Sequence, residues 1–156
     1  QILEPENTRA ALYSADIYTQ QEAWQQAESI YQELVQKNAQ NSKYYNHLAL
    51  FLGNRGQLKE SLRLLNKALD LDPDYSVAHY NRGVFLDKIG DAGGALRAYQ
   101  KAVVLDPKSA HYQYVMGMFY MKRTDHPELG RQHLKKSLRL NPDQSSAKTI
   151  EQTLNP

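Results

Sequence analysis

The chain repeats itself at an interval of about 34 residues, and this constrains its fold more than any other feature. Pro73 and Pro107 close similar apolar segments one such interval apart, while Pro142 closes a third segment after the same interval plus one residue. Gly56 and Gly90 are separated by the same interval as the first two prolines. A fixed period of about 20 to 50 residues is typical of proteins that stack one supersecondary unit many times. The sequence therefore predicts an architecture of stacked repeats.

Each period reads as two helices joined by a turn. Within residues 42–54 the apolar side chains follow the i, i+3, i+4, i+7 spacing of an amphipathic helix. Gly56 then supplies a flexible turn, and a stripe of leucines marks a second helix: Leu58, Leu62, Leu65 and Leu69. Pro73 cannot continue that helix. No stretch shows the sustained apolar–polar alternation of a hairpin strand, so we predict an all-α chain.

This pattern resembles the tetratricopeptide repeat, a helix-turn-helix unit of about 34 residues. Residues 76–109 match it best, through Tyr80, Asn81, Gly83, Gly90, Ala95, Tyr99 and the closing Leu105-Asp106-Pro107. The resemblance implies a right-handed α-solenoid with repeats at about 8–41, 42–75, 76–109 and 110–143, followed by a capping helix at about 144–154. We expect these parts to form a single domain over residues 1–156.

Two departures from the family pattern affect the third and fourth repeats. Gly93 and Gly94 open the second helix of the third repeat, and glycine weakens a helix by about 0.5–1 kcal/mol, so we expect that helix to start late or fray. The fourth repeat carries one extra residue, which we place between Thr124 and Pro127.

Composition narrows the class of protein further. Of the 156 residues 41% are hydrophobic and 23% are charged, which is typical of a folded chain rather than a disordered one. The absence of cysteine excludes disulfides and thiolate sites. The longest apolar run, residues 115–121, is far shorter than the ~20 residues that span a bilayer, so we expect a soluble chain without membrane binding. The chain begins at Gln1, which suggests an excised or processed segment; its compartment is unknown, with the cytoplasm favoured and the bacterial periplasm open.

Motifs for metal binding and catalysis are incomplete. The series Asp70, Asp72, Asp74 imitates the start of a calcium loop, but that loop needs a glycine where Tyr75 stands and a glutamate where Asn81 stands. No two of the five histidines have the i, i+4 spacing of a helical zinc site. No serine lies in a nucleophile elbow. We therefore predict no metal, no cofactor and no enzymatic activity.

Charge is distributed unevenly along the chain, although the net charge is only +2. Residues 1–40 are acidic, whereas residues 110–142 are basic. The basic residues at 122–139 could contact nucleic acid, but a solvated helix face is the preferred interpretation. Opposite charge at the two ends also permits head-to-tail association of copies, which would make the chain a homo-oligomeric scaffold.

The family resemblance implies where a partner would bind, because the first helix of each tetratricopeptide repeat lines a concave groove. It assigns to that groove Tyr13, Asp16 and Gln20; Asn46, His47, Leu50 and Asn54; Tyr80, Asn81, Val84 and Asp87; and His111, Tyr114, Val115 and Met118. Side-chain amides such as Asn46 and Asn81 can donate to and accept from a peptide backbone. Tyr80 and Tyr114 offer rigid, amphipathic contact area.

The sequence therefore favours a non-catalytic adaptor that binds a peptide or helix of another protein. The carboxylate clamp of repeats that hold chaperone tails is disfavoured, because neither frame of first helices supplies its basic residues. Two alternatives stay open: a self-assembling scaffold, and the scaffold segment of a larger enzyme or nucleic-acid-associated protein. Fold alone does not decide among them, since such repeats serve unrelated processes.

Overall fold

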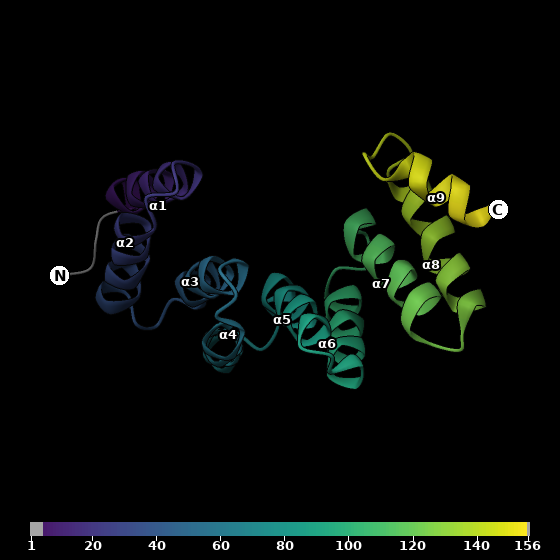
Figure 1. Cartoon of the computed structure of the whole chain (residues 1–156), viewed down its shortest axis with the longest axis horizontal. Helices are drawn as coiled ribbons and strands as arrows, with labels where there is room; N and C mark the ends of the chain where they lie inside the picture. Colours follow the sequence, from purple (N-terminus) through teal and green to yellow (C-terminus); the bar gives the residue numbers. More distant parts are fainter. Residues whose placement is uncertain (1–4, 156) are drawn as a thin grey trace. The chain divides into compact units, whose positions relative to one another are not determined.

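The computed structural model describes residues 5–155, with side chains from Thr8 onward. Over these residues the chain forms nine helices and no strand (Figure 1), which confirms the predicted all-α class. The helices are α1 (Pro5–Gln20), α2 (Trp24–Lys37), α3 (Ser42–Asn54), α4 (Leu58–Leu71), α5 (Ser76–Lys88), α6 (Ala92–Leu105), α7 (Ala110–Arg123), α8 (Pro127–Leu140) and α9 (Ala147–Leu154). The predicted repeat starts at residues 42, 76 and 110 each coincide with the first residue of a helix.

The helices divide into two compact units between Ala78 and His79. In the N-terminal unit α1 packs on α2, α2 on α3 and α3 on α4. The C-terminal unit holds most of α5 and all of α6 to α9, and in it α7 packs on both α6 and α8, and α9 packs on α8. Within each unit, helices that follow one another in sequence therefore lie side by side.

Three of the four hairpin turns use one left-handed residue. Glu22 (φ 58°), Gly56 (φ 84°) and Gly90 (φ 86°) occupy equivalent positions in successive repeats. In each turn the N–H of the following residue donates to the carbonyl five positions earlier, over 2.8–3.0 Å. This is the Schellman arrangement, which satisfies the free carbonyls at a helix end and favours glycine. The first turn uses a glutamate instead, so the glycine pattern showed only two of the three turns.

The fourth hairpin turn is built differently, and the extra residue predicted there lengthens its first helix. α7 has 14 residues, whereas α3 and α5 have 13 each. The loop after α7 has no left-handed residue within the described chain. The Thr124 hydroxyl instead donates to the Tyr120 carbonyl (3.0 Å) and accepts from the His126 N–H (3.2 Å). The side chain of Thr124 thus ends α7 without a glycine.

Small residues at one position of each second helix let the two helices of a repeat approach closely. Ala27, Ser61 and Ala95 are completely buried, and the fourth repeat has the buried Gly130 there. Four residues later a large side chain enters the core of each repeat: Tyr31, Leu65, Tyr99 and Leu134. The periodic residues of the sequence are therefore the packing residues of the fold.

The second helix of the third repeat does not start late, so the expectation drawn from its glycines is wrong. α6 begins at Ala92, directly after Asp91. The Asp91 carboxylate accepts a hydrogen bond from the Gly94 N–H over 2.8 Å. A side-chain cap of this kind satisfies a free N–H of the first turn and stabilises a helix by about 0.5–2 kcal/mol. The cap offsets the low helix propensity of the two glycines.

The C-terminal capping helix is confirmed, although it starts three residues later than predicted. α9 packs on α8, and its residue Ile150 is completely buried. A terminal helix with one apolar face closes the end of a repeat array and leaves a polar face to water. No helix in residues 5–155 combines the length and the apolar character that crossing a membrane requires.

Candidate partner-binding surfaces

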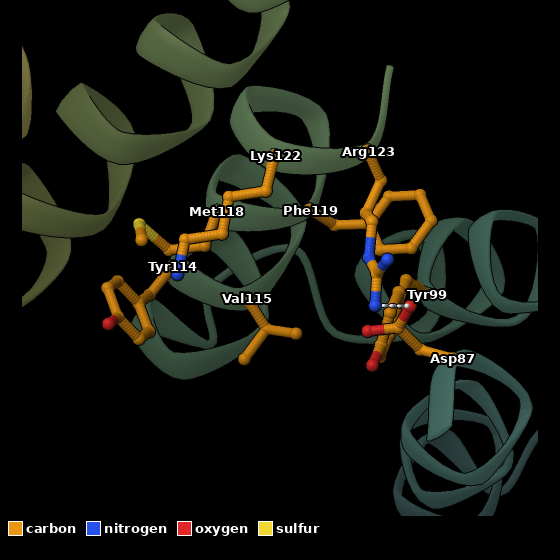
Figure 2. A pocket seen from close by; sticks show the side chains of 8 residues that line it. All are labelled: Asp87, Tyr99, Tyr114, Val115, Met118, Phe119, Lys122 and Arg123. Atoms are coloured by element: carbon orange, nitrogen blue, oxygen red, sulfur yellow. Dashed lines mark ion pairs between the residues drawn. The ribbon is translucent and has the colours of Figure 1, made fainter. Parts of the chain in front are cut away.

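The C-terminal unit has an open pocket of about 530 Å³ on the side of α7 (Figure 2). Its lining combines apolar, aromatic and charged side chains from α5, α6 and α7: Asp87, Tyr99, Tyr114, Val115, Met118, Phe119, Lys122 and Arg123. Ligand pockets typically enclose about 300–1,000 Å³ and place a few polar groups among apolar ones. Both the size and the lining of this pocket fit that description.

Three side chains of α7 form a strip along one side of the pocket. Tyr114, Met118 and Lys122 are four residues apart, and residues at that spacing share one face of a helix. Figure 2 shows all three projecting from the same side of α7. Tyr114 and Met118 are half-buried and Lys122 is exposed. The strip therefore offers two apolar surfaces followed by a cation.

An ion pair crosses the pocket from α5 to α7. The Arg123 guanidinium lies 3.1 Å from the Asp87 carboxylate (Figure 2). Their side chains are 53% and 29% exposed, so the pair contributes at most about 1 kcal/mol to stability. In this pair the guanidinium and the carboxylate neutralise each other's charge. No residue of the described chain forms an ion pair with Lys122, whose ammonium is left available.

The floor of the pocket is aromatic and tightly packed. The Tyr99 ring is 5% exposed and lies 5.5 Å from the Phe119 ring, edge to face. Gly83 makes room for it, because a Cβ atom at that position would come within 2.6 Å of the Tyr99 ring. Burial, followed by the nearby Asp87 carboxylate, raises the pKa of Tyr99, so its phenol stays neutral. The floor is therefore rigid and uncharged.

Tyr80 does not line the pocket, but its ring lies 6.2 Å from that of Tyr99 in the pocket floor and belongs to an aromatic cluster that adjoins the pocket. Its ring lies 4.9 Å from His111 and 5.4 Å from Tyr112. Burial lowers the pKa of His111 and raises that of Tyr80. Since both groups are held neutral, this cluster presents apolar ring surface between α5 and α7.

The N-terminal unit gathers some predicted side chains around Tyr31. The Tyr31 hydroxyl donates to the Asp16 carboxylate over 2.8 Å, and the His47 ring stacks on Tyr31 with an interplanar angle of 5°. Burial lowers the pKa of His47, against the opposing effect of Asp16. Tyr13 on α1 is 73% exposed, and Asn54 at the end of α3 is exposed as well.

The structure brings part of the predicted site together. Asp87, Tyr114 and Met118, with Val115 beside them, line one pocket. Asn46 and Asn81 are only 3% and 5% exposed, and their proposed bonds to a partner backbone stay a prediction.

Sequence reasoning missed four residues of this pocket: Tyr99, Phe119, Lys122 and Arg123. Tyr99 was identified only as a repeat residue, and Lys122 only as part of a solvated basic face. Extending the four-residue spacing of Tyr114 and Met118 by one more turn would have reached Lys122. Among the side chains described from Thr8 to Asn155, no three histidine, aspartate or glutamate side chains are grouped so that they could hold a metal ion.

Comparison with known proteins places the repeats in one family. The model of YpiA-like, C-terminal tetratricopeptide repeats matches residues 10–75, and a general tetratricopeptide repeat model matches residues 48–110. No curated protein sequence matches the chain.

Solved structures share the fold at low sequence identity. TTC0263, a thermophilic tetratricopeptide repeat protein in Thermus thermophilus, has a TM-score of 0.81 at 17% identity, covering 97% of this chain and 83% of its own. MamA from Desulfovibrio magneticus RS-1 has a TM-score of 0.73 at 19% identity, covering 94% and 90%. YrrB, described as a tetratricopeptide repeat protein with an unusual peptide-binding site, has a TM-score of 0.72 at 21% identity, covering 93% and 74%.

Proposed function

Because the chain belongs to the tetratricopeptide repeat family, we propose that it is a non-catalytic interaction module that binds a peptide segment of another protein. The observation that carries this proposal is the open pocket on α7 of the C-terminal unit. The peptide-binding site described for YrrB supports the same kind of function by analogy. Repeat proteins commonly use surfaces of stacked helices to bind partners.

The lining of the pocket suits a protein ligand. Tyr114 is a rigid aromatic side chain of the type that dominates binding energy at interfaces. Met118 is flexible and polarizable, so it adapts to different apolar side chains. The Asp87–Arg123 pair borders these apolar groups with polar ones, as is typical of the rim of an interface.

Selection of peptides from a random displayed library against the full chain tests this function. We expect selected peptides to bind the wild-type chain, and Tyr114→Ala or Met118→Ala to weaken binding roughly fivefold or more, since losing an interface hot spot costs more than ~1 kcal/mol. Val104→Ala is a matched control, because Val104 is an apolar side chain of α6 that is 72% exposed and lies outside the pocket.

The melting temperature of each variant separates lost binding from lost folding. The proposal requires the two pocket variants to keep a melting temperature near that of the wild type. If selection yields no peptide, or if Val104→Ala weakens binding as much as the pocket variants do, the assignment of a peptide site to α7 is wrong.

A further inference from the structure

We infer that the pocket on α7 recognises an extended peptide that carries two apolar side chains and then an acidic one, at three successive alternate positions. This inference rests on the proposed function and names the class of partner segment. It follows from the strip of Tyr114, Met118 and Lys122, from the charge left unpaired in the pocket, and from the size of the pocket.

The spacing of the strip matches the repeat of an extended chain. A helix rises ~1.5 Å per residue, so neighbouring members of the strip are separated by about 6 Å along the axis of α7. In an extended peptide, alternate side chains point to the same side and lie about 6.6 Å apart. Three alternate side chains of a peptide can therefore meet Tyr114, Met118 and Lys122 in succession, with a mismatch of only about 1 Å over the whole strip.

The unpaired charge selects the third side chain. Three charged residues line the pocket, and two of them, Asp87 and Arg123, neutralise each other across 3.1 Å. Of these three residues, only Lys122 lacks an ion-pair partner within the described chain. A peptide carboxylate at this end gains an attractive contact, whereas a peptide cation is repelled. Charge complementarity of this kind contributes to specificity more than to total affinity.

The dimensions of the pocket favour an extended segment over a helix. A helix with its side chains is about 10–12 Å wide, and docking it requires a long apolar groove. This pocket has about 530 Å³ of space and apolar contact only from Tyr114 to Phe119 along α7. That space accommodates a few side chains of a narrow strand.

Fluorescence polarization with short synthetic peptides and the full chain tests the register. The first peptide carries Leu, Leu and Glu at alternate positions in a Ser and Gly background, and is made in both chain directions. In the second peptide the Glu is moved by one position, and in the third Lys replaces it. We expect the better direction of the first peptide to bind about three- to fivefold more tightly than the other two, as for a solvent-accessible ion pair. The difference should shrink at high salt.

Charge reversal in the protein identifies the residue responsible. Lys122→Glu should reverse the preference, so that the Lys peptide binds more tightly than the Glu peptide. Lys135→Glu is the matched control, since Lys135 is an exposed lysine of α8 outside the pocket, and the preference should be unchanged there.

Different failures point to different errors. Equal binding of all three peptides, lost on Tyr114→Ala, overturns the register and the charge selection but leaves the peptide site intact. Tighter binding of a helical peptide with the same side chains at every fourth position overturns the extended conformation. If these peptides do not bind although library-selected peptides do, the inferred pattern is wrong. If neither set binds, the proposed function falls as well.

Discussion

Replacing Glu22 by glycine should stabilise the chain, because Glu22 is the one non-glycine residue at the left-handed position of the Schellman turns. Its φ of 58° matches the conformations of Gly56 and Gly90, one and two repeats later. A side chain in the left-handed region costs roughly 1–2 kcal/mol. Glycine removes that cost but adds about 0.5–1 kcal/mol of conformational entropy to the unfolded state. The net expectation is a stabilisation of about 0.5–1 kcal/mol.

Two further changes isolate the backbone from other causes. Glu22→Gln removes the charge of this exposed residue but keeps its side chain and backbone preference, so it should leave stability within about 0.5 kcal/mol of wild type. Gly56→Ala should destabilise the second turn by about 1 kcal/mol or more. A Cβ atom at Gly56 meets no atom within 4 Å, so backbone conformation and not crowding would be responsible.

Urea unfolding followed by far-UV circular dichroism measures these differences. A change of 1 kcal/mol also shifts the melting temperature of a chain of this length by about 2–4 °C. The reasoning is refuted if Glu22→Gly is neutral or destabilising, or if Glu22→Gln stabilises as much as the glycine does. In the second case the carboxylate and not the backbone would be the source of strain.

Two other predictions follow from the caps and the buried histidines. Gly93→Ala should stabilise α6 by about 0.5–1 kcal/mol, whereas Gly94→Ala should gain nothing, since its Cβ atom would clash with the Asp91 carboxylate that caps the helix. In an Asp91→Ala background Gly94→Ala should become stabilising, and urea unfolding that shows no such reversal would contradict the capping argument. Burial, and secondarily Lys136, lowers the pKa of His133 in the folded chain. The unfolded chain therefore binds this proton more readily, and stability should fall as the pH drops below about 6.5. Between about pH 7.5 and about pH 5.5, the urea midpoint of the His133→Gln variant should fall less than that of the wild type. An equal fall in both proteins would show that protonation of His133 does not cause the loss of stability.

The local pattern of the sequence determined the helices and their repeat. Three local signals carried this information: the apolar spacing, the small residues at positions such as Ala27 and Ala95, and the prolines after the second helices. Each of them acts on residues within one or two helical turns. Each repeat is held mainly by contacts close in sequence, so the repeat period carried directly into the order of the helices. Spacing also revealed the extra residue of the fourth repeat, but it pointed to the loop before Pro127, whereas the structure accommodates the extra residue in a longer α7.

The tertiary structure decided features that depend on contacts between helices or on backbone geometry. It placed Arg123 against Asp87, which leaves Lys122 as the unpaired cation of the pocket. It also decided how much of Asn46 and Asn81 stays accessible, which is only 3% and 5%. Helix periodicity tells which face a residue occupies, but not how closely the next helix approaches that face. How far a side chain is buried, and which charge it pairs with, depend on the distance between neighbouring helices. Only the folded chain could therefore decide both.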